Sequence, residues 1–509
     1  MSLLGIDVGT TGCKGMAFSE NGQILGRYYR EYRLSSPQSG WYELHGDIVW
    51  ESVKEIIRHI NKYEEIGKDP IKALSVSVSG DEFVPIGENG EVLYPTIMSQ
   101  DIRGKEEIEY LESIFTRKTL YSITGLPTHP KYGINRIMWI KRNKPDIYRK
   151  ARYFLGWEDF IYYKLGIEPV TDYSVAARFM AFDIRNKEWS EDILNAAGVN
   201  KNKLAKVVPS GTCVGYVNKK IGSELGLKEK VSVVAGGFDQ ACAALGAGVM
   251  RPGTAVVGTG TMESMSIALD KPVTSDEMLK NNYAWNIHVV PDMYTCSSTN
   301  VGGGQILKWY RDTFGEMEKL QAEKGSLDAY DIILKDLPKI PSGLLVLPHF
   351  AGSGPPYKDP NSLGAILGLK ITTKKSEFIL GLLEGITFEL WQNIENIEKE
   401  TGYEINEIRA VGGGAKSNFW LQLKSDMLNK LVLRPEVTEA GCLAAAILAG
   451  TGIGVYSSIQ EAADKLISIK YRFNPEIERH NDYLPYFKEY KKIYLLTKDV
   501  NHSLFLLKG

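Results

Sequence analysis

The spacing of apolar residues predicts strands and helices in alternation from the N-terminus onward. Residues 4–12 form an apolar run that ends in small residues, and residues 14–28 supply a second run, so together they predict a β-hairpin. Apolar residues at helical spacing predict a helix over 46–63, and the following alternation predicts a strand over 71–79. One long helix is expected over 103–119.

Three further elements are expected before the middle of the chain. A strand pair is predicted over 83–98, on either side of a Gly-Glu-Asn-Gly turn. A basic helix is predicted over 131–144, with Trp139 on its apolar face. A short β-branched strand is predicted over 231–235 and leads directly to Asp239.

The same order of elements begins again in the second half of the chain. Residues 253–261 repeat a β-branched strand followed by a tip of Gly and Thr. A strand over 408–411 then runs into three glycines, and Ser417 opens a helix that reaches about residue 428. A helix of small residues is expected from Gly441. The pattern predicts an α/β protein of two similar halves that meet near 243–252.

The composition agrees with two globular halves. A chain of 509 residues is too long for one hydrophobic core. The net charge of −2 gives no reason to expect nucleic acid or a membrane as a partner, and no apolar segment of about 18 uncharged residues is present. The cysteines are odd in number and scattered, so we expect free thiols and a cytoplasmic location: Cys13, Cys213, Cys242, Cys296 and Cys442.

The two Gly-Thr tips are candidates for phosphate binding. In the first tip, backbone N–H groups and the Thr10 and Thr11 hydroxyls can approach a phosphate, while Asp7 can hold a divalent cation. The second tip, residues 258–261, is of the same type. An ordinary hairpin turn is the alternative for either tip alone. No Walker pattern follows a strand here.

Acidic and glycine residues stand at the ends of four predicted strands. These are Asp7, the pair Asp81 and Glu82, Asp239, and the glycines 412–414. Ligands of open α/β sheets bind outside the carboxyl ends of strands, so the four ends are expected to meet in one cleft. Asp239 is interpreted either as a helix cap or as a general base that takes a proton from a substrate hydroxyl.

Other chemistries find little support in the sequence. His129 lies in a turn between Thr128 and Pro130 and is interpreted as structural. No spacing of His, Cys or acidic residues resembles a metal cage, and no GxSxG motif of a serine hydrolase is present. The three glycines lie far downstream of the position that a dinucleotide-binding fingerprint would take.

With these motifs in hand, the chain resembles the FGGY family of carbohydrate kinases, in the actin/hexokinase/Hsp70 superfamily. The resemblance extends over nearly the whole length. It rests on motifs in combination: Asp7-Val8-Gly9-Thr10-Thr11, Gly40-Trp41-Tyr42-Glu43, Asp101-Ile102-Arg103, Pro130-Lys131 through Trp139, Gly237-Phe238-Asp239-Gln240, Gly258-Thr259-Gly260-Thr261, Asp359-Pro360 through Gly364, Gly368, Leu383-Glu384-Gly385, and Gly412-Gly413-Gly414-Ala415-Lys416-Ser417.

The resemblance implies two RNase H-like domains around a cleft, residues 1–245 for sugar and phosphate and 246–509 for nucleotide, with ATP and Mg²⁺ as cofactors. It implies that Asp239 is the catalytic base and Asp7 the metal ligand. Implied substrate contacts are Asp81, Glu82, Asp101, Arg103, Trp157 and Gln240. Implied nucleotide contacts are Gly9, Thr10, Thr11, Lys14, Gly258, Thr259, Gly260, Thr261, Gly302, Gln305, Gly412, Gly413, Gly414, Ser417 and Asn418.

The expected reaction is the ATP-dependent phosphorylation of a terminal hydroxyl of a small sugar or polyol, such as a ketopentose. Departures from the family pattern occur at 79–83, at 156–159 and at 352–357. Because Asp81 and Glu82 can accept hydrogen bonds from hydroxyls, a neutral polyol or ketose is expected to fit better than a sugar acid. Two alternatives stay open, an actin- or chaperone-like ATPase and a kinase relative without activity. A homodimer is compatible with the resemblance.

Overall fold

The computed structural model describes residues 1–508, and its N-terminal half is built on a seven-stranded mixed sheet. The order is β13 (Cys213–Tyr216), β14 (Ser232–Val234), β5 (Ile71–Val78), β1 (Ser2–Val8), β2 (Gly12–Ser19) and β3 (Ile24–Glu31), with β15 (Gly237–Phe238) also paired to β5. Strand β1 is antiparallel to β2 and parallel to β5. This register places Asp7 opposite Lys14 on one side and Ser77 on the other.

The C-terminal half repeats this arrangement in a second seven-stranded sheet. Its order is β18 (Ala284–Ile287), β19 (Tyr294–Asn300), β17 (Glu263–Leu269), β16 (Thr254–Thr259), β22 (Glu407–Val411), β23 (Leu431–Pro435) and β24 (Ile469–Phe473). Strand β16 is antiparallel to β17 and parallel to β22, as β1 is to β2 and β5. The fold is therefore a two-domain α/β fold of the actin/hexokinase type, as predicted.

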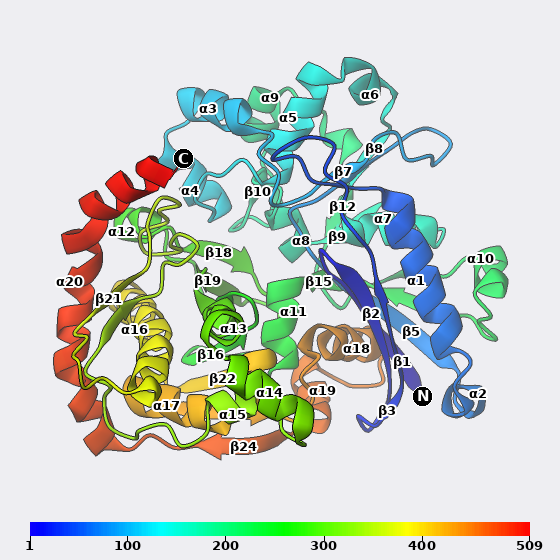
Figure 1. The fold of residues 1–509 in the computed structure, drawn as a ribbon. Helices are drawn as coiled ribbons and strands as arrows, with labels where there is room; N and C mark the ends of the chain where they lie inside the picture. The colour runs from blue at the N-terminus through cyan, green and yellow to red at the C-terminus, as the bar shows by residue number, and fades with distance from the viewer. Residues whose placement is uncertain (509) are drawn as a thin grey trace.

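Two helices of small residues lie between the sheets (Figure 1). Helix α11 (Asp239–Gly246) packs on β16 and β17, and α18 (Ala440–Gly452) packs on β1 and β5, so each helix contacts the sheet of the other half. Glycines permit the contact of α18 with β1 and the contact between the two helices. A Cβ on Gly5 would lie 1.9 Å from the carbonyl oxygen of Cys442, and one on Gly246 would lie 2.0 Å from that of Ala440.

Further helices lie around the two sheets. The buried apolar residues form two large cores, of which one lies within the N-terminal half and the other joins residues between 83 and 204 to the C-terminal half. The helices are α1 (Gly46–Ile60), α2 (Glu64–Lys68), α5 (Gly133–Asn143), α6 (Pro145–Lys150), α7 (Trp157–Lys164), α8 (Tyr173–Ala177), α9 (Glu191–Ala197), α10 (Lys219–Glu224), α12 (Asp276–Lys280), α13 (Gly303–Phe314), α14 (Glu316–Lys324), α15 (Ala329–Ile333), α16 (Lys375–Thr401), α17 (Asn418–Leu428), α19 (Ile459–Leu466) and α20 (Ile477–Lys508). Helix α20 runs along the outer edge of the C-terminal half (Figure 1).

Short strand pairs complete the fold, and one of them corrects a prediction. The predicted pair over 83–98 is confirmed only next to its turn, where Ile86 of β6 (Val84–Ile86) forms an antiparallel bridge with Val92. Strands β6 and β7 (Thr96–Ile97) do not pair with each other. Each pairs instead with a distant segment, β6 with β8 (Tyr153–Leu155) and β7 with β4 (Glu43–Leu44). The remaining pairs are β9 (Val170–Asp172) with β12 (Lys206–Val208), β10 (Phe182–Asp183) with β11 (Glu188–Trp189), and β20 (Leu345–Leu347) with β21 (Ala365–Leu367).

The predicted long helix over 103–119 is also wrong, because a cap divides it. Helix α3 (Lys105–Ile114) ends where Phe115 turns extended, and α4 (Arg117–Thr124) begins after Thr116. The Thr116 hydroxyl accepts a hydrogen bond from the Thr119 N–H, which starts a new helix. The predictions of the opening hairpin, of the helices from 46, 131 and 417, and of the strand over 71–79 are confirmed.

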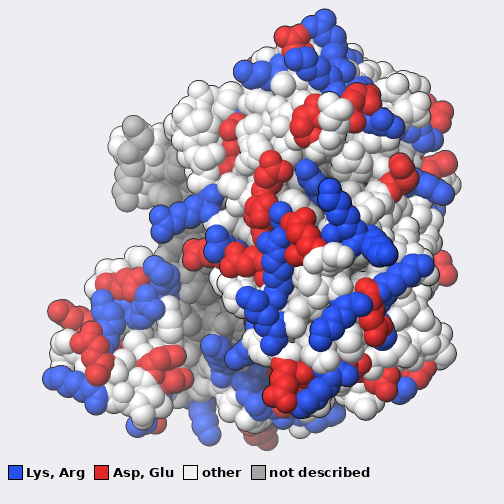
Figure 2. Space-filling model, turned by 90° about the vertical axis from the view of Figure 1, so that its right-hand side faces the viewer, with Lys and Arg blue, Asp and Glu red and all other residues white. Residues whose placement is uncertain are grey.

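Charges of both signs are spread over the surface. Figure 2 shows Lys and Arg intermingled with Asp and Glu on the face of the molecule that it presents. Among residues 1–508, no helix is long and apolar enough to cross a membrane. All five cysteines are free thiols, and four of them are buried.

The packing of α18 on β1 predicts that Gly5→Ala destabilises the protein. The added methyl group would overlap the backbone of α18, so we expect a loss of about 1–3 kcal/mol in the free energy of unfolding. Gly67→Ala in α2 is the matched control, because no atom lies within 4 Å of its new Cβ. Urea denaturation measures both variants. A Gly5→Ala protein as stable as the control would contradict the close packing.

Candidate active site

Asp7 lies at the end of β1, where three elements meet. The Ser77 hydroxyl donates a hydrogen bond of 2.6 Å to Asp7 Oδ1, as the register of β1 and β5 requires. The start of α18 lies against the same oxygen, since a Cβ on Gly441 would be 2.6 Å from it. Burial raises the pKa of the Asp7 carboxyl, and the hydrogen bond from Ser77 opposes that shift.

Asp239 is the first residue of α11, and its carboxylate is not used as a cap. The N-cap is Phe238, no side chain caps this helix, and the buried Oδ1 of Asp239 has no hydrogen-bond partner. Burial raises the pKa of Asp239 to about 8, and the nearby carboxylates of Asp7, Glu82 and Asp81 add to the shift. Arg178 acts in the opposite direction. An unpaired buried carboxyl is costly to the fold, which favours a functional role.

The first Gly-Thr tip joins β1 to β2 and faces the α18 helix. The Gly9 N–H donates to the carbonyl of Gly12 at 3.0 Å, which closes a tight turn. Thr10 is half-buried and Thr11 is exposed. Lys14 follows on β2 and forms an ion pair with Glu439, the residue before α18. The tip thus leaves hydroxyls and N–H groups accessible next to Asp7.

The second tip lines a cavity of about 630 Å³ in the C-terminal half. Seven of the predicted nucleotide residues line it: Thr259, Gly260, Thr261, Gln305, Gly413, Gly414 and Ser417. Four others flank it in the chain: Gly258, Gly302, Gly412 and Asn418. The sequence analysis missed several lining residues, among them Lys308, Tyr330 and Trp420. Tyr330 comes from α15, a segment that carried no motif.

Glycines bring the walls of this cavity together. The Gly304 N–H at the start of α13 donates to the Gly260 carbonyl at 2.9 Å, and a Cβ on Gly304 would lie 2.3 Å from that oxygen. Gly412 has φ +83° and lies against Thr259, a backbone conformation that favours glycine. The Gln305 N–H likewise donates to the Thr261 carbonyl at 3.0 Å, so the start of α13 holds the tip in place through its own N–H groups.

Asp81 and Glu82 are already paired within the protein, so they offer a substrate fewer acceptor positions than the sequence analysis assumed, and the expectation of a neutral substrate stays a prediction. Asp81 Oδ1 lies 2.7 Å from Arg178 Nη2, and its Oδ2 lies 3.1 Å from Lys131 Nζ. These charges lower the pKa of Asp81 to about 2 despite burial. Glu82 is fully buried and accepts hydrogen bonds from the Ser79 hydroxyl at 2.6 Å and the Ser99 N–H at 3.1 Å.

Three other predicted substrate residues lie in the interior. Arg103 pairs with Asp101 at 2.6 Å and with Glu43 at 2.7 Å, and its guanidinium stacks 3.9 Å from the centre of the Trp41 ring. Trp157 is 1% exposed in the N-terminal core. In this structure, these side chains hold loops together rather than line an accessible surface. Gln240 is half-buried and follows Asp239 directly.

The sequence analysis missed two cations beside the acidic strand ends. Arg178 follows α8 and is 4% exposed; besides Asp81 it contacts Asn286 of β18 at 2.8 Å, so it joins the two halves. Lys131 belongs to a quoted family motif, but no role was assigned to it. No local pattern predicts that either cation neutralises Asp81, because these contacts bring together segments that are distant in sequence.

The carboxylates of Asp7 and Asp239 fit a divalent cation. Both residues are half-buried, the two carboxylates repel each other when ionised, and the buried Oδ1 of Asp239 has no partner. Within residues 1–508, no group of three or more His, Cys, Asp or Glu residues forms a metal cage. Mg²⁺ needs no such cage, because one or two carboxylates together with nucleotide phosphates and water can complete its shell.

A buried ion pair is hydrogen-bonded to Thr259 of the second tip. Lys424 of α17 pairs with Glu263 of β17, and both side chains are at most 3% exposed. The Thr259 hydroxyl donates to Glu263 Oε2 at 2.7 Å and accepts from Lys424 Nζ at 3.1 Å. The pair therefore fixes the rotamer of Thr259 at the edge of the cavity.

Comparison with known proteins shows the family. The models of the N-terminal and C-terminal domains of the FGGY family of carbohydrate kinases match residues 2–246 and 253–453. The chain therefore belongs to the FGGY family of carbohydrate kinases, and it is an ATP-dependent kinase that acts on a small sugar or polyol. Membership of this family rules out the alternative of an actin- or chaperone-like ATPase.

The relatives differ in the substrates that their names state. A xylulose kinase of Staphylococcus epidermidis is 30% identical over 505 residues, which cover 99% of both chains. A gluconokinase of Bacillus subtilis is 28% identical and covers 94% of this chain and 93% of its own. The solved structure of a Brucella ovis xylulose kinase superposes with a TM-score of 0.88 at 23% identity, covering 98% of this chain and 100% of that one. That likeness shows the shared fold.

The ion pair beneath Thr259 predicts a large effect of Lys424→Met. The variant leaves the Glu263 carboxylate buried without its cation, so we expect a loss of about 3–5 kcal/mol in the free energy of unfolding. Replacing both partners, in Lys424→Met with Glu263→Gln, removes the buried charge and restores much of that loss. Chemical denaturation of the two variants measures the difference. Equal stability of the single and double variants would contradict the buried-pair interpretation.

Proposed function

We propose that Asp239 is the general base of this kinase. In this mechanism Asp239 accepts the proton of a terminal substrate hydroxyl as its oxygen bonds to the γ-phosphorus of ATP, the bond to the bridging oxygen breaks, and ADP leaves. The observation that carries the proposal is the half-buried Asp239 carboxylate at the start of α11, whose buried Oδ1 has no partner and which lies among other carboxylates. Gln240, the next residue, is suited to orient the same hydroxyl.

The nucleotide is proposed to bind along the second tip. Residues of the cavity lined by Thr259 and Gly413 would hold the base and ribose, and the tip residues Gly260 and Thr261, which line the same cavity, would hold phosphates. The first tip, with Thr10 and Thr11, would contact the transferred phosphoryl group from the other half. Asp7 would hold Mg²⁺, which neutralises charge on the phosphates.

Closure of the two halves is proposed to complete the site. The tips belong to different sheets, and α11 and α18 form the contact between those sheets. We place the division of the halves at residues 245 and 246, where α11 ends. Closure would exclude water and bring the acceptor oxygen in line with the phosphorus, which phosphoryl transfer requires. Arg178 contacts both halves, so its hydrogen bond to Asn286 would change when the halves move.

The base assignment predicts opposite effects of Asp239→Asn on activity and stability. The amide accepts no proton, so kcat should fall by about 10²–10⁴ while the nucleotide still binds. The same change removes a carboxyl whose ionised form, the form that accepts the proton, is destabilised by the fold. Because the pKa is about 8 in the folded protein and near its ordinary value when unfolded, the wild type loses stability as pH rises from about 4 to 8.

The Asn variant lacks this loss, so its Tm should exceed that of the wild type, and the excess should grow between pH 4 and pH 8. Asp192→Asn in α9, an exposed change of the same size, serves as the control and should alter neither quantity. ADP release and thermal unfolding measure the two effects. Normal turnover of Asp239→Asn would refute the assignment of the base, whereas a lower Tm would show that the carboxylate stabilises the fold.

A further inference from the structure

Strand β15 leads directly into the proposed base, and only one of its edges is paired with another strand. Gly237 and Phe238 pair in parallel with Ser77 and Val78 of β5, the only strand that pairs with β15 among residues 1–508. The N–H groups of Gly236 and Phe238, two residues apart, point to the other side. A buried N–H group needs an acceptor, and no strand supplies one at this edge.

Two side chains supply the acceptors that a neighbouring strand would supply. The Gly236 N–H donates to Glu158 Oε1 of α7 at 2.7 Å, and the Phe238 N–H donates to Ser174 Oγ of α8 at 2.9 Å. Both acceptor residues are 0% exposed, so water does not compete for either N–H group. Glu158 lies in one of the segments that depart from the family pattern, residues 156–159.

The two acceptors belong to one hydrogen-bonded unit. Glu158 Oε2 accepts the Asp172 N–H at 2.7 Å, and Asp172 Oδ2 accepts the Ser174 N–H at 2.8 Å. Asp172 is also the N-cap of α8 and accepts the Ser210 hydroxyl at 2.7 Å. The positions of Glu158 and Ser174 are thus fixed relative to each other, so they hold β15 as a pair.

The segment before the base needs this support because it contains two glycines. Both are required by close contacts: a Cβ on Gly236 would lie 1.7 Å from the Val76 carbonyl oxygen, and one on Gly237 would lie 2.3 Å from Val289 Cγ1. Glycine, however, has more backbone freedom than any other residue when nothing holds it. The two hydrogen bonds, one on each side of Gly237, remove that freedom directly before Asp239.

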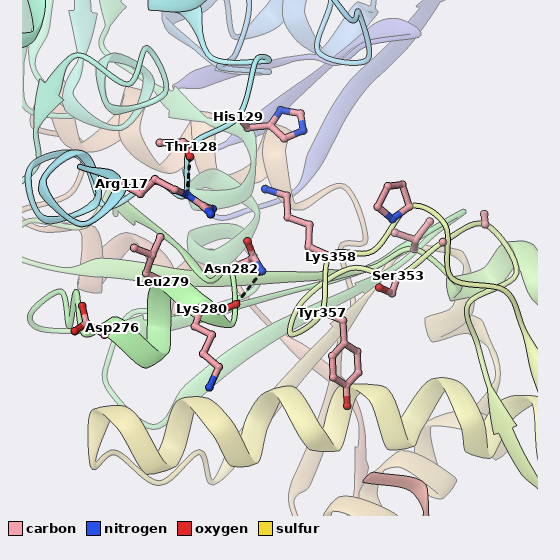
Figure 3. A pocket seen from close by; sticks show the side chains of 14 residues that line it. Arg117, Thr128, His129, Asp276, Leu279, Lys280, Asn282, Ser353, Tyr357 and Lys358 are labelled. Carbon is pink, nitrogen blue, oxygen red and sulfur yellow. Dashed lines mark hydrogen bonds between the residues drawn. The ribbon is translucent and has the colours of Figure 1, made fainter. Parts of the chain in front are cut away.

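This support lies away from the nucleotide cavity and from a second cavity between the two halves. The second cavity, of about 910 Å³, is lined by residues of α4, α12 and the loop over 351–360, among them Arg117, Lys280 and Lys358 in Figure 3. The nucleotide cavity is lined by the second tip and by residues of α13, α15 and α17. Neither lining includes a residue of α7, α8 or β15, so the two acceptors are not part of either surface.

We propose that Glu158 and Ser174 are positioning residues of this kinase, which orient the Asp239 carboxylate toward the acceptor hydroxyl. They do so by holding the backbone N–H groups that precede the base. The inference rests on the proposed role of Asp239 as the general base. Proton transfer requires the two oxygens within hydrogen-bond reach, and a displacement of about 1 Å can lower the rate by about 10².

Ser174→Ala removes one acceptor and leaves the base in place. We expect kcat to fall by about 10- to 100-fold, because the base loses its alignment, while KM for ATP stays unchanged. ADP release is measured with xylulose, ribulose, fructose, erythritol, glycerol and gluconate, and the variants are compared on the compound that reacts fastest. Ser52→Ala in α1 is the matched control: Ser52 is 3% exposed and donates to the Ile48 carbonyl at 2.8 Å, so its loss should lower stability but not kcat.

Glu158→Gln tests the same support through the other acceptor. Glutamine keeps the size of glutamate but has one acceptor oxygen, whereas the two Glu158 oxygens accept the N–H groups of Gly236 and Asp172 separately. One of these N–H groups therefore loses its acceptor, and kcat should fall as it does in Ser174→Ala. This variant decides the question if Ser174→Ala does not fold.

The sharpest comparison places each change in the Asp239→Asn background. Residues that act through the base have no further effect once the base is absent, so the double variants should turn over as fast as Asp239→Asn alone. A purely structural role would lower kcat by the same factor in both backgrounds.

Two results would overturn the inference and leave the base assignment intact. The first is a normal kcat in Ser174→Ala and Glu158→Gln, and the second is a loss that adds fully to that of Asp239→Asn. If Asp239→Asn itself turns over normally, or if no compound of the panel is phosphorylated, the proposed function fails, and this inference fails with it.

Discussion

The close packing of α11 and α18 between the two sheets is the constraint on which the site depends. Gly5 lets α18 touch β1, and Gly246 lets α11 touch α18, each at a distance that leaves no room for a methyl group. Because α11 begins with Asp239 and α18 begins beside Asp7, this contact sets the separation of the proposed base from the first phosphate tip. The small residues of these helices thus position the proposed catalytic groups by allowing close packing.

The parts of the fold that the sequence predicts well are those with local causes. The hairpin around the first tip follows from its apolar runs, and the helix after Ser417 follows from a capping residue. The helix expected over 103–119 was wrong because the capping signal of Thr116 was outweighed by helical periodicity. The pairing of β6 with β8 was missed because β8 is distant in sequence, and no periodicity reports such a contact.

In the candidate site, too, residues with local sequence signatures were predicted, and residues placed by distant contacts were missed. The glycines that line the nucleotide cavity form turns, and turns have local signatures, whereas Tyr330 reaches that cavity from a helix without any motif. The acidic pair at 81 and 82 was visible in the sequence, but its partners Arg178 and Lys131 are brought to it only by the tertiary fold. Whether a carboxylate is free or paired decides what it can bind, so the chemistry of the substrate side needed the structure.

The site keeps negative charge without full compensation. Asp239 lies near the carboxylates of Asp7, Asp81 and Glu82, and its Oδ1 has no hydrogen-bond partner. This arrangement lowers the stability of the ligand-free protein, and a divalent cation held near Asp7 would relieve it. Binding energy is thereby directed toward the closed, reactive arrangement.

Direct titration of Asp239 tests the central claim most sharply. Carbon NMR of the ligand-free protein labelled at Asp carboxyl carbons, compared with the Asp239→Asn variant, reports the pKa of this one group. The account predicts a carboxyl resonance that titrates near pH 8 and is absent from the variant. If the resonance that disappears in the variant titrates near pH 4, the ordinary range for Asp, Asp239 is neither desolvated nor crowded by carboxylates, and the account is contradicted.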